Sequence, residues 1–282
     1  MKYNYHFKLH ISNILFSLVP LIVKLVSISA IPITLGRCLS AIVCLWVISK
    51  RYIQEVSFSS REWIVLGFVS FLMCMSWVTY FVGIKSTSVA LSIVLFNTHP
   101  LFTALIEPLC LRSKCYSFHE IITTIGVLVG IIVLVSGQIN VNGAFIGVIS
   151  CLASALTLSI RNCLIKAHLA NVNSPFIMLC HCLCAILFLS PFFPDLFTAS
   201  LIDWSGIIVL GCFVTAYAHS ILVSSIQNSS AKTVGIITCL QPIYTICLGK
   251  IILDEPISIH IILGTIIIFI TVFYESYTSI HK

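Results

Sequence analysis

The chain has 282 residues, of which 59% are apolar or aromatic and 9% are charged, against roughly 25% charged residues in soluble domains. Its mean hydropathy is +1.11, so most of its surface must be solvated by lipid, because a single soluble core cannot hold that much apolar area. This composition excludes a disordered chain, and a net charge of +6 is too diffuse for nucleic-acid binding. We therefore expect an all-α integral membrane protein.

Apolar runs of about 20 residues follow one another along the whole chain, each bounded by charges, prolines, glycines or polar clusters. They predict ten transmembrane helices joined by short connections, which leaves no room for an extramembrane domain. The predicted spans are 11–29, 33–49, 62–84, 88–111, 118–136, 142–166, 175–193, 203–226, 230–253 and 256–277.

The distribution of Lys and Arg predicts the orientation of these spans, because these residues concentrate in cytoplasmic loops. With a cytoplasmic N-terminus, 11 of the 15 fall on the inner side, Arg161 among them. The 4 assigned to the outer side or outer half are Lys24, Arg37, Lys85 and Lys250. We read the first apolar run as a retained helix, and we expect a multi-pass protein of a cell inner membrane with both termini in the cytoplasm.

Similar residues recur at a long period and predict two halves of five helices each, at 8–137 and 142–278. The aligned positions are Ser88–Pro100 with Ser230–Pro242 and Trp77 with His219 at an offset of 142, and Trp63 with Trp204 and 117–119 with 258–260 at an offset of 141. Because each half has an odd number of helices, the second half enters the membrane from the opposite side. Such inverted repeats occur mostly in secondary transporters.

These residues carry a family resemblance over essentially the whole chain. It rests on the proline in the middle of the fourth span, on the ends of the first two spans, and above all on 230–269. The residues concerned are Lys24, Pro32, Arg37, Pro100, Pro242, Gly249, Asp254, Glu255 and Gly264. The chain resembles EamA-type members of the drug/metabolite transporter superfamily, which implies ten helices in two repeats and transport of a small metabolite.

His99 and Gln241 are the first pair of candidate site residues, since they occupy equivalent positions midway along the fourth and ninth spans. Each is followed by a proline, Pro100 or Pro242, which removes a helical hydrogen bond and favours a bend. Transporter sites are commonly built at such bends, so we expect a substrate cavity there. The alternative is that the polar groups only join neighbouring helices. Two further residues complete this part of the expected cavity, Asn97 and Tyr244.

Trp77 and His219 form a second pair, with Tyr80 and Tyr217 close by in the sequence. An aromatic pocket with one titratable group suits an amino acid, a nucleoside-like solute or another amphipathic metabolite. His219 is also the candidate for carrying a coupling proton, the alternative being a histidine that is only packed. Arg37 is interpreted either as a binder of an anionic substrate group or, like Lys24, as a cation that reaches the outer interface.

The 13 cysteines are typical of small apolar residues, because most stand singly in apolar runs. Cys180, His181, Cys182 and Cys184 suggest a metal site, but only Cys180 and Cys184 share a helix face, so core packing is favoured and no metal or cofactor is expected. The GxxxG pairs Gly126/Gly130 and Gly143/Gly147 fit helix contacts within a monomer or a homodimer.

Neither a P-loop nor a hydrolase motif is present, so the chain is not expected to be an enzyme. The predicted function is secondary transport of an amino acid or related solute by alternating access, driven by a proton gradient or by the gradient of the solute. The alternative within transport is a carrier of S-adenosylmethionine or a nucleotide-like cofactor. A polytopic membrane enzyme is the alternative from another class. The expected partners are a small-molecule substrate and the lipid bilayer, with no nucleic acid.

Overall fold

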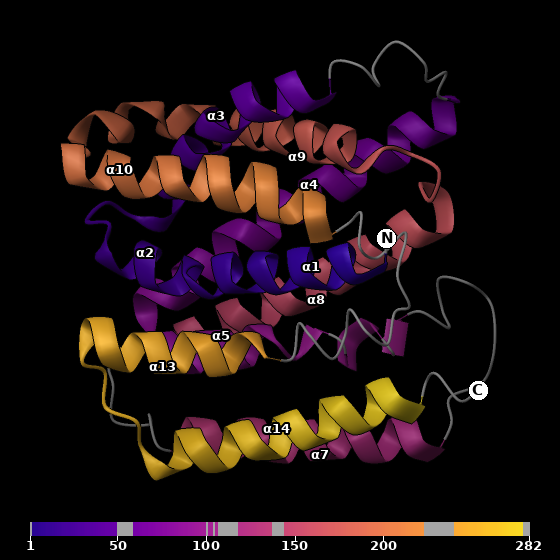
Figure 1. Ribbon diagram of the computed structural model, residues 1–282, viewed down its shortest axis with the longest axis vertical. Coiled ribbons are helices and arrows are strands. Elements are labelled where there is room, and N and C mark those ends of the chain that lie inside the picture. The colour runs from indigo at the N-terminus through magenta and orange to yellow at the C-terminus, as the bar shows by residue number, and fades with distance from the viewer. Residues whose placement is uncertain are drawn as a thin grey trace.

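A computed structural model of the chain describes residues 2–49, 59–99, 101–103, 105–106, 118–136, 144–222 and 240–278, and all regular structure in these ranges is helical. The helices lie side by side with roughly aligned axes (Figure 1). The α-helices are α1 (Lys2–Ser17), α2 (Val19–Leu25), α3 (Ala30–Ser49), α4 (Ser60–Ser86), α5 (Val89–Phe96), α7 (Phe118–Ser136), α8 (Ala144–His168), α9 (Ser174–Leu189), α10 (Leu201–Val209), α13 (Gln241–Leu253) and α14 (Ile259–Thr278). A 3-10 helix, η1 (Ser190–Thr198), and a π-helix, η2 (Leu210–Ala218), precede and follow α10.

These helices coincide in position with the predicted spans. Five described stretches are long and apolar enough to cross a membrane, namely Ala30–Ile48, Ser60–Ser86, Phe145–His168, Ser174–Thr198 and Leu201–Leu222. Five shorter apolar helices lie within the other predicted spans or extend them by one residue. The all-helical membrane architecture is therefore confirmed, while the count of ten spans stays a prediction.

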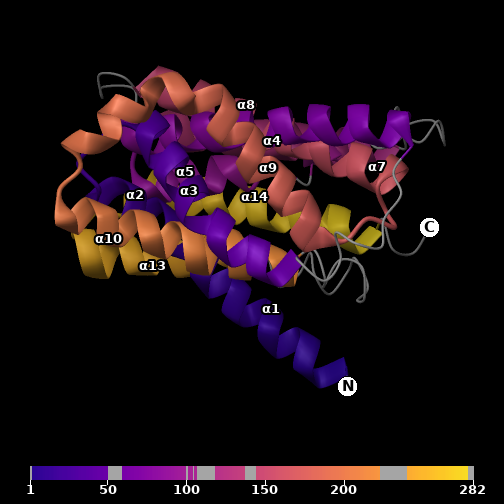
Figure 2. The same ribbon diagram turned by 90° about the horizontal axis from the view of Figure 1, so that it is seen from above.

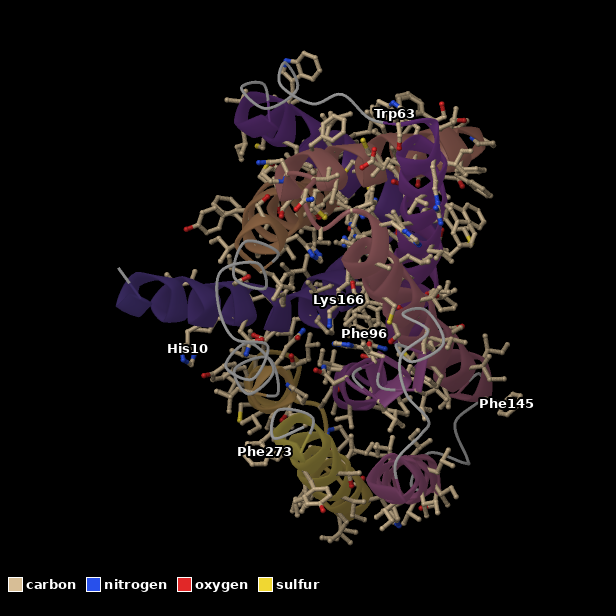
Figure 3. The ribbon with its side chains drawn as sticks, turned by 90° about the vertical axis from the view of Figure 1, so that its right-hand side faces the viewer. His10, Trp63, Phe96, Phe145, Lys166 and Phe273 are labelled. Carbon is tan, nitrogen blue, oxygen red and sulfur yellow. The ribbon has the colours of Figure 1, made fainter. Side chains whose placement is uncertain are left out.

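The outside of the bundle is apolar, as a surface in contact with lipid must be. Large hydrophobic side chains are exposed on many helices, and they include Phe145, Phe197, Leu201, Ile202 and Ile251. Phe145 points away from the bundle in Figure 3. An apolar surface of this extent is not found on soluble monomers, so these side chains mark the surface that lipid covers.

Helix pairing relates the first half of the chain to the second. α3 packs against α9, α5 against α13 and α7 against α14, so each element meets its counterpart. The repeat also relates two further contacts. α4 packs against α8, and the counterpart of α4, η2, packs against α1, which is the counterpart of α8. α4 ends where α10 begins, because Lys85 bonds the carbonyl oxygen of Val26 while the next residue, Ser27, bonds Asp203. The related elements α4 and α10–η2 therefore run in opposite directions, as an inverted arrangement requires.

Short polar caps set several helix boundaries. Ser59 and Glu62 form a capping box at the start of α4, and Ser200 and Asp203 form another at the start of α10. α13 ends at Asp254, whose left-handed φ of 51° turns the chain toward α14. The start of α1 and the end of α14 lie at the same end of the bundle (Figure 1), and in the perpendicular view α1 slants away from one side of the bundle (Figure 2).

Glycines allow α7 and α14 to approach each other closely within one chain. A Cβ atom on Gly130 would lie 2.5 Å from Cγ1 of Ile268, and one on Gly264 would lie 2.9 Å from the carbonyl oxygen of Gly130. A Cβ atom on Gly126 would lie 2.8 Å from Oγ1 of Thr271. The Gly126/Gly130 pair thus packs inside the monomer. Gly143 lies outside the described residues.

Replacing Gly264 with alanine should lower the unfolding free energy by about 1–3 kcal/mol, because the added methyl group meets backbone that cannot move aside. Gly67 is the matched control, since nothing lies within 4 Å of the Cβ position there. Gly67→Ala should leave stability unchanged or slightly higher, as alanine favours helix. Thermal unfolding in detergent measures both variants, and equal effects would contradict the close contact of α7 and α14.

Candidate functional site

Arg37 lies in the interior of the bundle, seven residues after the start of α3, with only 2% of its surface exposed. Its guanidinium carbon lies 4.2 Å from the ring centroid of Trp77 and 4.7 Å from that of Phe81, both on α4. These are cation–π contacts, which attract the charge to the ring faces. Nε and Nη2 of Arg37 have no hydrogen-bond partner among the described residues. Arg37 therefore does not reach the outer interface, and that interpretation is wrong.

Trp77 also connects α4 to the second half of the chain. The ring centroids of Trp77 and His219 are 6.3 Å apart in an edge-to-face arrangement. Phe16 of α1 also contacts His219, with their ring centroids 4.6 Å apart. His219 directly follows η2, and it lies within electrostatic range of both Arg37 and Arg161. Trp77, His219 and Arg37, three of the predicted site residues, are thus brought together.

Tyr80, one helical turn after Trp77, extends this group toward α5. Its ring stacks on Phe96 at a centroid distance of 4.2 Å, and Phe96 lies 5.8 Å from His99. The buried hydroxyl oxygen of Tyr80 and Nδ1 of His99 have no hydrogen-bond partner among the described residues. Phe96 lies in the middle of the bundle in Figure 3. We call the following residues the central cluster: Phe16, Arg37, Trp77, Tyr80, Phe81, Phe96, His99 and His219.

Among the described residues, no ring contact or side-chain hydrogen bond joins the other predicted site residues to this cluster. Asn97 is buried, but its amide nitrogen donates to the carbonyl oxygen of Ile93 in its own helix, at 2.9 Å. Gln241 and Tyr244 are in the first turn of α13, which packs against α5. Tyr217 is 44% exposed on the outside of the bundle, so its placement in the pocket is wrong. Two positions apart on a helix, Tyr217 and His219 face nearly opposite sides.

The two prolines stand next to helix starts or interruptions. α5 ends at Phe96, and Asn97 and Thr98 form a turn before His99. Pro100 itself lies outside the described residues. Pro242 is in the first turn of α13, where its missing N–H group has no helical partner to lose.

A buried polar network joins α4, α8 and α9. Arg161 directs Nη2 and Nε to Nε2 of His181, at 2.9 and 3.2 Å, and its Nη1 donates to Oδ1 of Asn162 at 2.8 Å. Arginine only donates, so Nε2 of His181 must accept, and the proton is on Nδ1. Nδ1 then donates to Oγ of Ser70, which is 2.8 Å away. The imidazole is therefore neutral and the network keeps the positive charge of Arg161.

This network corrects the assignment of Arg161 and bears on the disfavoured metal alternative. Arg161 was counted among the charges of the inner side, but it is 6% exposed and lies within α8. Both ring nitrogens of His181 are engaged by Ser70 and Arg161, so His181 is not free to bind a metal beside the cysteines. The available signal for Arg161 was a charge five residues before the end of the predicted span 142–166, and counting it with the loop charges hid that signal.

The interior thus holds two guanidinium groups, and within the described residues neither has a carboxylate partner. The described carboxylates with placed side chains all lie at or just beyond helix ends or in η1. They belong to Glu62, Asp195, Asp203, Asp254 and Glu255. An uncompensated charge in a low-dielectric interior costs several kcal/mol. This positive interior is the main electrostatic feature of the site.

A second polar group, which we call the end cluster, closes one end of the bundle. Lys24 donates to the carbonyl oxygens of Ile84 and Thr87 at 3.1 and 2.5 Å, and Lys85 donates to that of Val26. Lys24 therefore bonds the end of α4. The end cluster consists of Lys24, Ser27, Lys85, Asp203 and Glu255.

Two carboxylates complete the end cluster. Asp203 accepts from N and Oγ of Ser27 at 2.6 and 2.7 Å. Glu255 accepts from the backbone N of Val89 at 3.0 and 2.9 Å, which places a negative charge at the positive start of α5. Next to it, Gly249 leaves room for Val89, because a Cβ atom there would lie 3.3 Å from Cγ1 of Val89. Outside this contact, the exposed Asp254 pairs with Lys250 at 2.5 Å, and that contact lowers the pKa of the Asp254 carboxyl.

His181→Ala should destabilise the protein by about 2–4 kcal/mol, because it leaves Nε and Nη2 of the buried Arg161 guanidinium without their acceptor. His181→Gln should recover part of this loss, since the amide oxygen can accept. His260, exposed at the start of α14, supplies the control His260→Ala. The three variants are compared by their unfolding temperatures in detergent. A similar loss of stability in His181→Ala and His181→Gln would show that the hydrogen bond to Arg161 is not the cause.

The comparisons with known proteins agree with this architecture. The model of the EamA-like transporter family matches the chain twice, over residues 6–136 and 145–276. No curated protein matches the chain. Among solved structures 24 chains match, and one crystal structure of a protein has a TM-score of 0.68 at 14% sequence identity. That alignment covers 99% of this chain and 98% of the other, so the two share a fold over their full length.

Proposed function

Because the chain belongs to the EamA-like transporter family, and is thus a multi-pass membrane protein of a family of transporters, we propose that it is a secondary active transporter. It moves a small metabolite, such as an amino acid or related solute, across the inner membrane of a cell. The two five-helix repeats, 8–137 and 142–278, alternate the access of one central site to the two sides. The gradient of protons or of the solute itself supplies the energy.

The observation that carries this proposal is the central cluster, because both halves of the chain contribute to it. Trp77 of α4 meets His219 of the inversely oriented counterpart, and these two residues are aligned by the repeat. Polar atoms of Arg37, Tyr80 and His99 lie buried there without partners among the described residues. A transporter needs such groups to bind its solute, and their location between the repeats lets relative motion of the repeats expose them to either side.

The end cluster supports a proposal about the side of the membrane toward which this structure is closed. With both termini in the cytoplasm, the end of α2, the end of α4 and the start of α10 face outward. Side chains bond backbone across these elements at that end: Lys24 donates to the carbonyl oxygen of Thr87, and Asp203 accepts from the backbone N of Ser27. We infer that the structure represents a state closed toward the outside, and that breaking the end cluster opens it.

Trp77→Ala and His99→Ala should each reduce saturable solute flux by at least about tenfold, because both remove groups at the proposed site. Liposomes with the reconstituted protein, loaded with candidate solutes, measure this flux. Phe145→Ala is the control, since Phe145 faces lipid and its loss should leave flux unchanged. Normal flux in both site variants would show that the solute does not pass through the central cluster.

His219 is the residue that we propose to carry a coupling proton. The groups around it are Phe16, Trp77, Arg37, Arg161 and His181. Its direct ring contacts are aromatic, so neither Phe16 nor Trp77 exchanges a proton with it. His219→Gln should abolish the dependence of flux on an imposed pH gradient and leave solute binding intact. If the pH-gradient dependence survives in this variant, another group carries the proton.

A further inference from the structure

We propose that the solute carries a negatively charged oxygen group, either a carboxylate or a phosphate monoester, and that Arg37 binds this group. The inference rests on the transport function proposed above and names the substrate class of the same site. It excludes solutes that are neutral or only cationic, which the proposed function by itself leaves open.

The first argument is the state of the Arg37 side chain. The guanidinium is almost completely buried, yet Nε and Nη2 have no hydrogen-bond partner among the described residues. An arginine is always charged, and a buried charge without a partner is costly. Cation–π contacts with Trp77 and Phe81 offset this cost only in part. An anion bound during transport would supply the missing partner.

The second argument is the geometry of the Arg37 donors beside the aromatic rings. Trp77 and Phe81 present their rings to the guanidinium carbon of Arg37, at 4.2 and 4.7 Å. The N–H donors lie in the plane of the guanidinium group, so their hydrogen bonds run outward from its edges. Nε and Nη2 form one edge of the fork, which matches two oxygens of a carboxylate or phosphate. The unpartnered donors are therefore arranged for bidentate binding.

The third argument is the charge of the surroundings. Arg161 adds a second buried guanidinium, whose partners are Asn162 and the neutral ring of His181. His219 is within electrostatic range of Arg37 and Arg161, so the two charges act on one region. Among the described residues no carboxylate balances either charge. This field attracts an anion and repels a cationic solute.

The remaining polar groups of the central cluster suit the rest of such a solute. The hydroxyl of Tyr80 and Nδ1 of His99 are buried and have no partner among the described residues. They can bond uncharged parts of a solute whose anionic group is held by Arg37. The ring of Phe96, which contacts both Tyr80 and His99, adds an apolar surface. We thus expect an anionic metabolite with further polar atoms rather than a simple inorganic ion.

Ligand-induced shifts of the unfolding temperature of the purified full chain in detergent test this inference. The probes are small carboxylates, with succinate as the reference, and phosphate monoesters, with ethyl phosphate as the reference. Succinamide, triethyl phosphate and 1,4-diaminobutane are neutral and cationic analogues of similar shape. We expect saturable stabilisation by at least one anionic series and none by the analogues; the series that binds distinguishes carboxylate from phosphate.

Variants at Arg37 separate binding from folding. Arg37→Gln should weaken binding of the anion by at least about tenfold, and Arg37→Lys should restore only part of it, because lysine lacks the fork. Without ligand, Arg37→Gln should unfold at the same temperature as the wild type or higher, since it removes an unpaired buried charge. Lys250→Gln, at an exposed lysine, is the control and should bind normally.

Three results would overturn the inference: no binding by any anion, equal binding of succinate and succinamide, or unchanged anion binding by Arg37→Gln. Flux in liposomes decides the transport function separately. If an anion binds in a way that depends on Arg37 but is not transported, the proposed transport function is overturned and the anion site at Arg37 is kept. Flux of a neutral solute that Arg37→Gln leaves unchanged would keep transport and overturn the anion site.

Discussion

The cation–π contact of Arg37 with Trp77 links the buried charge of the interior to both halves of the chain. It places a permanent charge between α3 and α4, and Trp77 in turn reaches His219 and so the second half of the chain. Lipid offers no partner to such a charge, so Arg37 has to face inward and the helices around it have to enclose it. The surrounding helices satisfy that requirement with aromatic rings, which attract the cation but leave its hydrogen bonds unused.

The architecture could be read largely from the sequence, because the length of an apolar run and the residues that bound it are local properties. Predicted span 118–136 coincides with α7, and the spans at 142–166 and 175–193 begin within two residues of α8 and α9. Two features needed the structure. The first span is divided at Leu18 into α1 and α2, and the connection after Leu189 forms the 3-10 helix η1. A proline stands at each place, Pro20 in the first turn of α2 and Pro194 inside η1, but a proline alone does not fix whether a helix bends, divides or tightens.

The site was less accessible to sequence reasoning, because side-chain direction depends on how each helix is rotated. Repeat alignment correctly brought Trp77 and His219 into one pair, and buried charge pointed to Arg37. Tyr217 was misplaced, since proximity in sequence does not mean a shared helix face. Arg161 was missed because its position near the end of a span resembles that of a loop charge. Its acceptor, His181, comes from another helix 20 residues further along the chain.

The π-helix η2 marks a structural difference between the two halves of the chain. The offset between the halves is 141 at Trp63 and Trp204 but 142 at Trp77 and His219, so the second half has one additional residue between these positions. η2 lies in that interval, whereas α4 is α-helical throughout, and a π-turn holds one residue more than an α-turn. The widened turn absorbs the extra residue and keeps His219 opposite Trp77. The two halves therefore differ in helical register beside Arg37, so the surfaces that they present to the central cluster are unlike.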